Sequence, residues 1–465
     1  MDSALNRAAP DSGQTRLSRA TVARYAAGSL GTGGFATLPG LVLVYYLTDS
    51  LGVTALAAGL IVTLAKIWDV VIDPVIGGLS DRALARSGSR RGPMLVGAIG
   101  LPIAFTLTFA VPAGLAPAAA GTWVVVAFIA AATFFSLFQV PYIALPAELT
   151  DGYGERTRLL TWRVVVLTLA ILLFGAGGPE LRGLFPDNPL LGYLVMAVVA
   201  SIVLCAGLWI ASTVAPRGAR PVAAAASSVS NGPDQRFLGH YRAGVAALRE
   251  SQPFRALLAT FMIQGLTTGL MLAGAQFVAT WVLRDEGAVT ILFVALIAPA
   301  LLVAPLWRVA ADRIGKERAF RIASVLFLIA TLLLVGMLWA PGWWIVAPVA
   351  LAGAAYAGMQ TLPMAMLPDV IAHDGGDRAG VFGGVWTAGE TAGMALGSTV
   401  LALSLAATGY VESVAGQVVE QPSTAVAAIA LCFSLIPALL MLLSLVTLGR
   451  YRLREQDITG AGAPR

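Results

Sequence analysis

Three ionisable residues, Lys66, Asp69 and Asp73, lie close together in one apolar run, LAKIWDVVIDPVIGG. In a helix, Asp69 and Asp73 are four residues apart, so both point to the same face. Two such carboxylates can supply oxygen ligands to a hard cation such as Na⁺, or their repulsion can make one of them take up a proton. The alternative is a structural ion pair between Lys66 and Asp69. Because that pair leaves Asp73 unexplained, we predict that Asp69 and Asp73 bind a coupling cation, and that they are metal ligands if this cation is Na⁺.

Three further polar residues interrupt apolar segments: Gln139, Arg163 and Glu390. Gln139 can face a central cavity or form a hydrogen bond between helices. Glu390 can line the same cavity or bond the hydroxyls of Thr387 and Thr391. Arg163 can reach inward to a substrate or act as a positive anchor at the membrane surface.

The composition indicates that all these residues lie within a membrane protein. Of the 465 residues, 58% are hydrophobic and 12% are charged, and the mean hydropathy is +0.81. Soluble domains carry about 25% charged residues, so a chain this apolar needs lipid as its solvent. Cys205 and Cys432 both lie in apolar runs, and we expect neither a disulfide nor a metal cluster.

About twelve segments are long and apolar enough to cross a bilayer as helices, which requires about 20 residues each. We therefore predict an all-α membrane protein with six spans on each side of a polar break. The predicted spans are, approximately, 25–48, 54–79, 93–113, 120–145, 159–178, 190–214, 255–283, 288–310, 320–340, 343–366, 380–408 and 424–448.

The positive charges predict the orientation of these spans. If both termini are cytoplasmic, the cytoplasmic tails, loops and helix ends hold all of the 30 Lys and Arg residues except Lys66, Arg182 and Arg284. This asymmetry is typical of membrane insertion, so the basic composition does not indicate a nucleic-acid partner. The polar first 20 residues lack the apolar core of a signal peptide and are predicted to be a cytoplasmic tail.

The two halves repeat a pattern of prolines and charged pairs. Pro141, Pro146 and the pair Glu155-Arg156 recur 222 residues later as Pro363, Pro368 and Asp377-Arg378. Pro74 and Asp81-Arg82 recur 231 residues later as Pro305 and Asp312-Arg313. Such pairs are common enough to coincide by chance, but four equal spacings favour an internal repeat, as found in transporters. We expect the pairs to lie in short cytoplasmic loops and to form ion pairs between the halves in one transport state.

The predicted domain organisation follows from the spans and the break between them. It comprises a tail over 1–24, an N-terminal half over 25–215, a central cytoplasmic loop over 216–252, a C-terminal half over 253–448 and a tail over 449–465. The later part of the central loop has apolar residues at helical spacing and is either a short helix on the membrane surface or a plain tether.

Three stretches resemble one known family, the glycoside–pentoside–hexuronide:cation symporters of the major facilitator superfamily, which includes the melibiose carrier. The stretches are IWDVVIDPVIGGLSDR, ALPAELTDGYGERTRLLTWR and MLPDVIAHDGGDRAGVFGGVW. The resemblance implies the major facilitator fold of two pseudo-symmetric six-helix halves. It also implies that Asp69 and Asp73 bind Na⁺, Li⁺ or H⁺ and that Arg163 contacts a sugar.

The chain departs from that family where the family has charged sugar-binding residues. Ser29 stands where an Asp is frequent, Gln139 replaces an Asp, and Thr391 replaces a Lys. The coupling residues are thus retained while the sugar site is altered. The substrate-binding residues that we expect are Ser29, Gln139, Tyr142, Arg163, Trp386, Glu390 and Thr391.

We therefore predict a secondary active transporter, not an enzyme, that couples symport of a sugar or glycoside to Na⁺ or H⁺ by alternating access. The first alternative is symport of another small molecule, such as a lysolipid, and the second is a non-transporting receptor. No nucleotide-binding motif is present, so we expect no cofactor. The expected partners are a small-molecule substrate and membrane lipid, and we expect a monomer in a bacterial inner membrane.

Overall fold

The computed structural model describes residues 16–150, 153–216, 248–374, 379–417, 419–451 and 453, and these are almost entirely helical. The N-terminal helices are α1 (Arg19–Asp49), α2 (Ala55–Ser87), α3 (Arg91–Phe109), α4 (Pro117–Leu149), α5 (Tyr153–Gly183) and α6 (Pro189–Ser212). The C-terminal helices are α8 (Gln252–Phe277) with the π-helical turn η1 (Val278–Val282), α9 (Ala288–Ile314), α10 (Lys316–Leu334), α11 (Val346–His373), α12 (Ala379–Ala407), α13 (Ser423–Phe433) and α14 (Leu435–Leu448). Two short 3-10 turns, η2 (Val335–Leu338) and η3 (Trp343–Ile345), connect α10 to α11.

These elements form twelve helices long and apolar enough to cross a membrane, which confirms the predicted spans. Lipid offers no hydrogen-bond partners, so each segment satisfies its backbone within its own helix. Polar side chains at the ends cap several helices, because the first backbone N–H groups lack partners there. Ser18 accepts from the Thr21 amide, and Ser251 accepts from the Phe254 amide.

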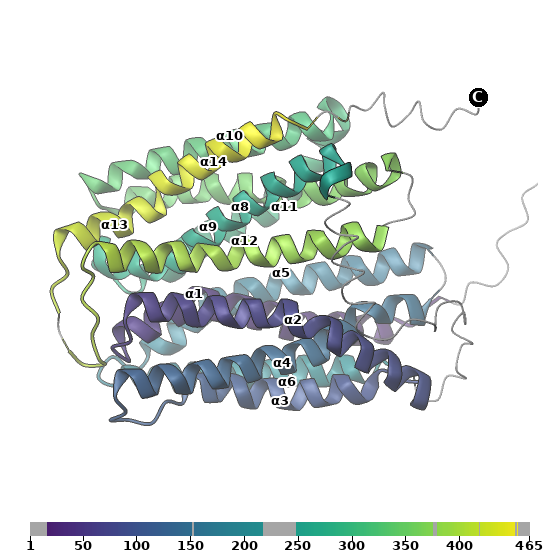
Figure 1. The fold of residues 1–465 in the computed structure, drawn as a ribbon, viewed down its shortest axis with the longest axis horizontal. Helices are drawn as coiled ribbons and strands as arrows, with labels where there is room; N and C mark the ends of the chain where they lie inside the picture. The colour runs from purple at the N-terminus through teal and green to yellow at the C-terminus, as the bar shows by residue number, and fades with distance from the viewer. Residues whose placement is uncertain are drawn as a thin grey trace, which may run out of the picture.

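The six N-terminal and the C-terminal helices form two groups that lie side by side (Figure 1). Helices α1 to α6 occupy the lower part of that view and α8 to α14 the upper part. Helices α1, α2 and α5 contact α8, α12 and α9 of the other group, so these six helices line the boundary between the halves.

The sequence pattern predicted that the charged pairs of the repeat lie in loops, but the three pairs within the described residues lie in helices. Asp81-Arg82 belongs to the last turns of α2, and Glu155-Arg156 belongs to the first turns of α5. Asp312-Arg313 likewise lies within α9. A hydropathy window registers only the apolar part of a helix, whereas the backbone stays helical after the chain has left the hydrocarbon layer.

The prolines also act differently from expectation at two places. Helix α4 runs without interruption through Pro141 and Pro146, although proline normally kinks or breaks a helix. Membrane helices tolerate such prolines because neighbouring groups satisfy the freed carbonyls. In contrast, the last predicted span is divided at Ser434 into α13 and α14. Pro437 explains this division, because its ring cannot donate a hydrogen bond and clashes with the carbonyl four residues earlier.

The two halves are joined by polar contacts at the end of the bundle where α1 ends. Leu51 and Val414 pair as an antiparallel β-bridge, and the Ala55 amide donates to the Glu412 carboxylate at 2.8 Å. The Tyr410 hydroxyl donates to the Asp49 carboxylate at 2.6 Å. We call this set of contacts, together with the ion pair described next, the outer latch.

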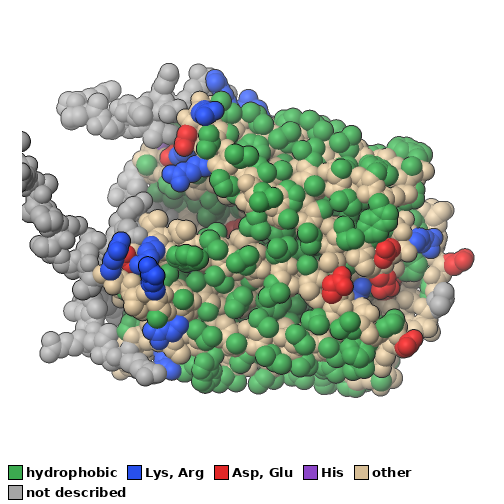
Figure 2. All heavy atoms as spheres, turned by 180° about the vertical axis from the view of Figure 1, so that it is seen from behind, with side chains coloured by type: hydrophobic (Ala, Val, Ile, Leu, Met, Phe, Trp, Pro, Cys, Tyr) green, Lys and Arg blue, Asp and Glu red, His purple; other side chains and the backbone are tan. Residues whose placement is uncertain are grey.

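An ion pair completes the outer latch beside these contacts. Arg182, at the end of α5, lies 3.2 Å from Glu286, just before α9, and is only 6% exposed. Its guanidinium also donates to Tyr193 at 3.1 Å and lies over the Tyr45 ring at 5.8 Å. At the opposite end, where α1 begins, the surface is hollowed between the two halves (Figure 2). The bundle is therefore closed at the outer latch and open at the end where α1 begins.

Candidate functional site

Helix α2 places Asp69 and Asp73 on a face where both carboxylates keep free oxygen atoms. Lys66 donates to Oδ2 of Asp69 at 3.2 Å, so the predicted ion pair is present. However, Oδ1 of Asp69 and Oδ1 of Asp73 are both buried, and neither has a hydrogen-bond partner among the described residues. Buried acceptors of this kind are costly unless a ligand satisfies them. The ion pair therefore does not account for the whole site, and two free oxygens are available to a cation.

Ser136 of α4 supplies a third oxygen that the sequence analysis missed. Its hydroxyl contacts the Asp73 carboxylate, and the residue is 2% exposed. One turn earlier, Thr133 accepts a hydrogen bond from the indole of Trp68 at 2.8 Å, which holds α4 against α2. The sequence contains a pattern that could have identified Ser136. Polar residues recur at a spacing of three, as Thr133, Ser136 and Gln139, and form a polar stripe on an otherwise apolar helix.

Replacing Ser136 by Ala should weaken cation binding without disturbing the bundle. The change removes one uncharged oxygen ligand, and a hydrogen bond or ligand contact to a charged group contributes about 1.5–3 kcal/mol. We expect the cation concentration for half-maximal uptake to rise about tenfold or more. Cation titration of uptake in proteoliposomes measures this, with Ser212→Ala as control, since the Ser212 hydroxyl bonds only its own helix backbone. An unchanged titration in Ser136→Ala would exclude Ser136 from the site.

The predicted substrate residues of the N-terminal half lie together between α1 and α4. The Tyr142 hydroxyl donates to the Tyr25 carbonyl at 2.8 Å and lies 3.3 Å from the Ser29 hydroxyl. Gln139 accepts from the Thr32 hydroxyl at 2.8 Å. Ser29 and Tyr142 are fully buried. Several of the predicted substrate-binding residues thus form hydrogen bonds between α1 and α4. For Gln139 this is the second of the two predicted roles, a hydrogen bond between helices.

Arg163 extends from α5 toward the same group. Its guanidinium lies over the Tyr142 ring, 5.4 Å from the centroid, and contacts the Tyr142 hydroxyl. The side chain is half-buried, and its Nε atom has no hydrogen-bond partner in the part of the chain that the structure describes. Arg163 thus lies against a buried residue of the bundle, whereas an anchor at the membrane surface would point away from it. Its role in substrate binding stays a prediction.

The C-terminal half contributes Trp386, Glu390 and Thr391 from α12. The Trp386 ring stacks on Phe261 of α8 with centroids 4.5 Å apart, and its indole N–H donates no hydrogen bond to another described residue. Glu390 lies near Tyr356 of α11. Among the described residues its carboxylate forms no hydrogen bond with Thr387 or Thr391, and the Thr387 hydroxyl instead donates to the backbone of its own helix. Thr391 is half-buried.

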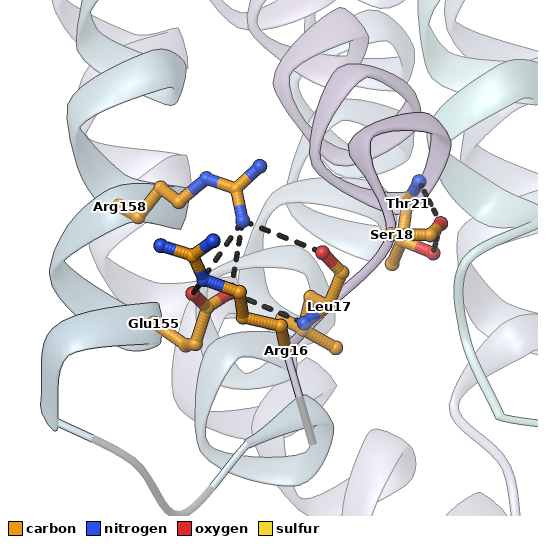
Figure 3. A network of polar contacts seen from close by, with 6 residues as sticks. All are labelled: Arg16, Leu17, Ser18, Thr21, Glu155 and Arg158. Atoms are coloured by element: carbon orange, nitrogen blue, oxygen red, sulfur yellow. Dashed lines mark hydrogen bonds and ion pairs between the residues drawn. The ribbon is translucent and has the colours of Figure 1, made fainter. Parts of the chain in front are cut away.

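The charged pairs of the repeat form their contacts within one half. Glu155 accepts from the Leu17 amide at 3.2 Å and pairs with Arg158 at 3.1 Å and with Arg16 at 4.0 Å. Arg158 also donates to the Leu17 carbonyl at 3.3 Å. These contacts tie the start of α1 to the start of α5 (Figure 3).

Asp81 and Arg156, members of two of the charged pairs, also form their contacts within the N-terminal half. Asp81 pairs with Arg90 at 2.7 Å, and Arg90 also pairs with Glu148 of α4. Arg156 donates to the Thr150 carbonyl. Arg82, Asp312 and Arg313 form no ion pair within the part of the chain that the structure describes, and Asp377 and Arg378 lie outside it. The predicted ion pairs between halves are thus absent from the described residues in this state, which is open at that end, and they remain a prediction for the state closed there.

Comparison with known proteins relates this geometry to a family. The family model described as "MFS/sugar transport protein" matches residues 24–455. A glucuronide carrier protein homolog of Escherichia coli is 25% identical over 95% of this chain and 94% of its own length. The sodium-dependent lysophosphatidylcholine symporter 1 of Xenopus tropicalis is 24% identical over 71% of this chain and 67% of its own. The crystal structure of a D-xylose-proton symporter matches 94% of this chain and 98% of its own with a TM-score of 0.67 at 13% identity.

Proposed function

Because the chain belongs to the MFS/sugar transport protein family, we propose that it carries a sugar or glycoside across the membrane together with Na⁺ or H⁺. The family assignment agrees with the resemblance of its sequence motifs to glycoside:cation symporters. The observation that carries the proposal is that, among the described residues, one buried carboxylate oxygen of Asp69 and one of Asp73 have no hydrogen-bond partner, and that the Ser136 hydroxyl contacts the Asp73 carboxylate. Oxygen atoms of this kind within a membrane bundle suit a hard cation or a proton.

The proposed mechanism is alternating access between two halves that close at one end at a time. We place the protein in the inner membrane of a bacterial cell, with both termini in the cytoplasm. The reason is that Lys and Arg residues gather at the end of the bundle where α1 begins. The described state is then open to the cytoplasm and closed at the outer latch. Cation binding at Asp69 and Asp73 raises the affinity for the substrate, and by linkage the substrate raises the affinity for the cation to the same extent. The monomer contains both sites.

A lysolipid is the second candidate substrate. The similarity to a lysophosphatidylcholine symporter favours it, as does the replacement of charged sugar-binding residues by Ser29, Gln139 and Thr391. The fold and the cation site are the same under both proposals, so only the substrate distinguishes them.

Thermal stability of the purified protein with a panel of sugars, glycosides, hexuronates and lysolipids, each in Na⁺ or in K⁺, tests the proposal. A ligand at 100 times its dissociation constant stabilises the folded state by about 2.7 kcal/mol. We expect one sugar class to raise the melting temperature, and to raise it further in Na⁺ or at low pH. Stabilisation by lysolipids alone would transfer the proposal to the second candidate.

A further inference from the structure

The connection between α12 and α13, residues 408–422, crosses to the other half of the protein. It is longer than the usual connection of about 4–6 residues, and long loops in compact folds are commonly functional. In Figure 1 this segment (yellow-green) runs from the upper group of helices down to the lower group. Its residues 410–415, which we call the outer strap, thus come from the C-terminal half and contact the N-terminal half.

The outer strap pairs with the end of α1 and the α1–α2 connection through its backbone. The Ser413 amide donates to the Thr48 carbonyl at 3.0 Å, and the Ser413 carbonyl accepts from the Gly52 amide at 3.0 Å. The Ala415 amide donates to the Ser50 carbonyl, also at 3.0 Å. An extended peptide binds the edge of a sheet through main-chain bonds of the same kind. The outer strap therefore docks on the N-terminal half as a short extended segment.

Two side chains of the outer strap add to this pairing. The Tyr410 hydroxyl donates to the Asp49 carboxylate at 2.6 Å. Glu412 accepts from the amide of Ala55, the first residue of α2, at 2.8 Å. The N-cap residue Thr54 forms no side-chain capping bond with the described residues, although the first amides of a helix need an acceptor. Glu412 thus caps a helix of the other half.

Two glycines flank the outer strap. Gly409 and Gly416 have φ angles of 74° and 87°, a region that glycine adopts at little cost. No atom of the described residues lies within 4 Å of the place where a Cβ would stand at either position. The base of the strap is fixed to its own half, because Gln421 accepts from the Val411 amide at 3.0 Å and donates to the Val411 carbonyl at 2.7 Å. A segment with a fixed base and glycines at both ends can detach and dock as a unit.

We propose that the outer strap is a hinged lid that holds the protein closed at the outer latch, and that its release permits opening at that end. This inference rests on the alternating-access mechanism of the proposed function and identifies the segment that sets its resting state. The strap bonds join the two halves only while the outer end is closed, so they stabilise that state relative to the other. Loss of one bond therefore shifts the population toward closure at the end where α1 begins.

Spin-label distances at the end opposite to the outer strap test the inference. The labels are attached to Arg86→Cys and Arg318→Cys in a protein whose Cys205 and Cys432 are replaced by Ala. Arg86 lies in the last turn of α2 and Arg318 in the first turn of α10, and both are exposed. Double electron–electron resonance on the purified full-length protein measures the distance between the labels, which shortens when that end closes. Local disorder of the strap alone does not change this distance.

Three variants of the outer strap and one control give the expected pattern. Tyr410→Phe keeps the ring and removes the hydroxyl that binds Asp49, so we expect the ratio of short to long distances to rise about tenfold, the factor for one hydrogen bond to a charged group. Glu412→Ala removes the cap of α2 and should raise the ratio about threefold or more, whereas Glu412→Gln keeps an oxygen acceptor and should raise it less. Glu420→Ala should leave the ratio unchanged, because Glu420 is exposed in the same connection and forms no hydrogen bond or ion pair with other described residues.

Each outcome bears on the inference in a definite way. If the labelled parent shows both distances and the ratio is unchanged in Tyr410→Phe and Glu412→Ala, the strap is not the lid, and alternating access stands. A rise in Glu420→Ala as large as that in Glu412→Ala overturns the assignment of the effect to the strap contacts. A single long distance in every variant, with sugars, lysolipids and cations present, excludes alternating access, and the inference is excluded with it.

Discussion

Asp73→Asn should abolish concentrative uptake while substrate still exchanges across the membrane. The change removes the negative charge that attracts the cation but keeps the shape of the side chain. Without bound cation, its gradient no longer drives accumulation, because the coupling free energy between the two sites is lost. In proteoliposomes with an inward cation gradient, we expect the internal substrate concentration to stop at the external value, whereas counterflow of labelled for unlabelled substrate continues.

The matched control is the same substitution at a carboxylate outside the bundle. Asp187 is exposed in the turn between α5 and α6 and forms no ion pair with other described residues, so Asp187→Asn should accumulate substrate normally. Accumulation that persists in Asp73→Asn would show that the coupling cation binds elsewhere. Loss of counterflow as well would indicate that Asp73 also takes part in the conformational change.

A disulfide across the outer latch should stop transport, and reduction of that disulfide should restore transport. Leu51 and Val414 form an antiparallel bridge between the halves, and Cα atoms in such pairs lie about 4.5–5.5 Å apart. That separation falls within the range that a disulfide spans. Because alternating access requires this end to open, we expect uptake by the oxidised Leu51→Cys, Val414→Cys protein to fall to background, and a reductant to restore it.

The cross-link experiment needs a background without other thiols. Cys205 and Cys432 are unpaired in the structure and are first replaced by Ala. Each single cysteine variant, treated with the same oxidant, should transport as well as its parent. Full uptake by a protein whose cross-link is verified by mass spectrometry would mean that the outer latch stays closed throughout the cycle.

The family and the number of spans could be read from the sequence because their causes are local. A helix in lipid must satisfy its own backbone and needs about 20 apolar residues, so hydropathy alone locates it. Asp69 and Asp73 are four residues apart in one helix, so the sequence spacing alone also predicts that both lie on the same face. The errors concern helix ends, at Arg82 and Glu155, where the backbone remains helical beyond the apolar segment.

The contacts between helices depended on tertiary structure. The rotation of α4 about its axis decides that Ser136 faces Asp73, and the packing of α5 decides that Arg163 lies against Tyr142 rather than at the surface. The hydrogen bond between Tyr410 and Asp49 joins residues 361 positions apart, and nothing in the sequence near either residue predicts it. Hydropathy determined which segments of this protein enter the membrane. The packing of side chains, which hydropathy does not describe, determined which of their polar groups meet and at which end the bundle is closed.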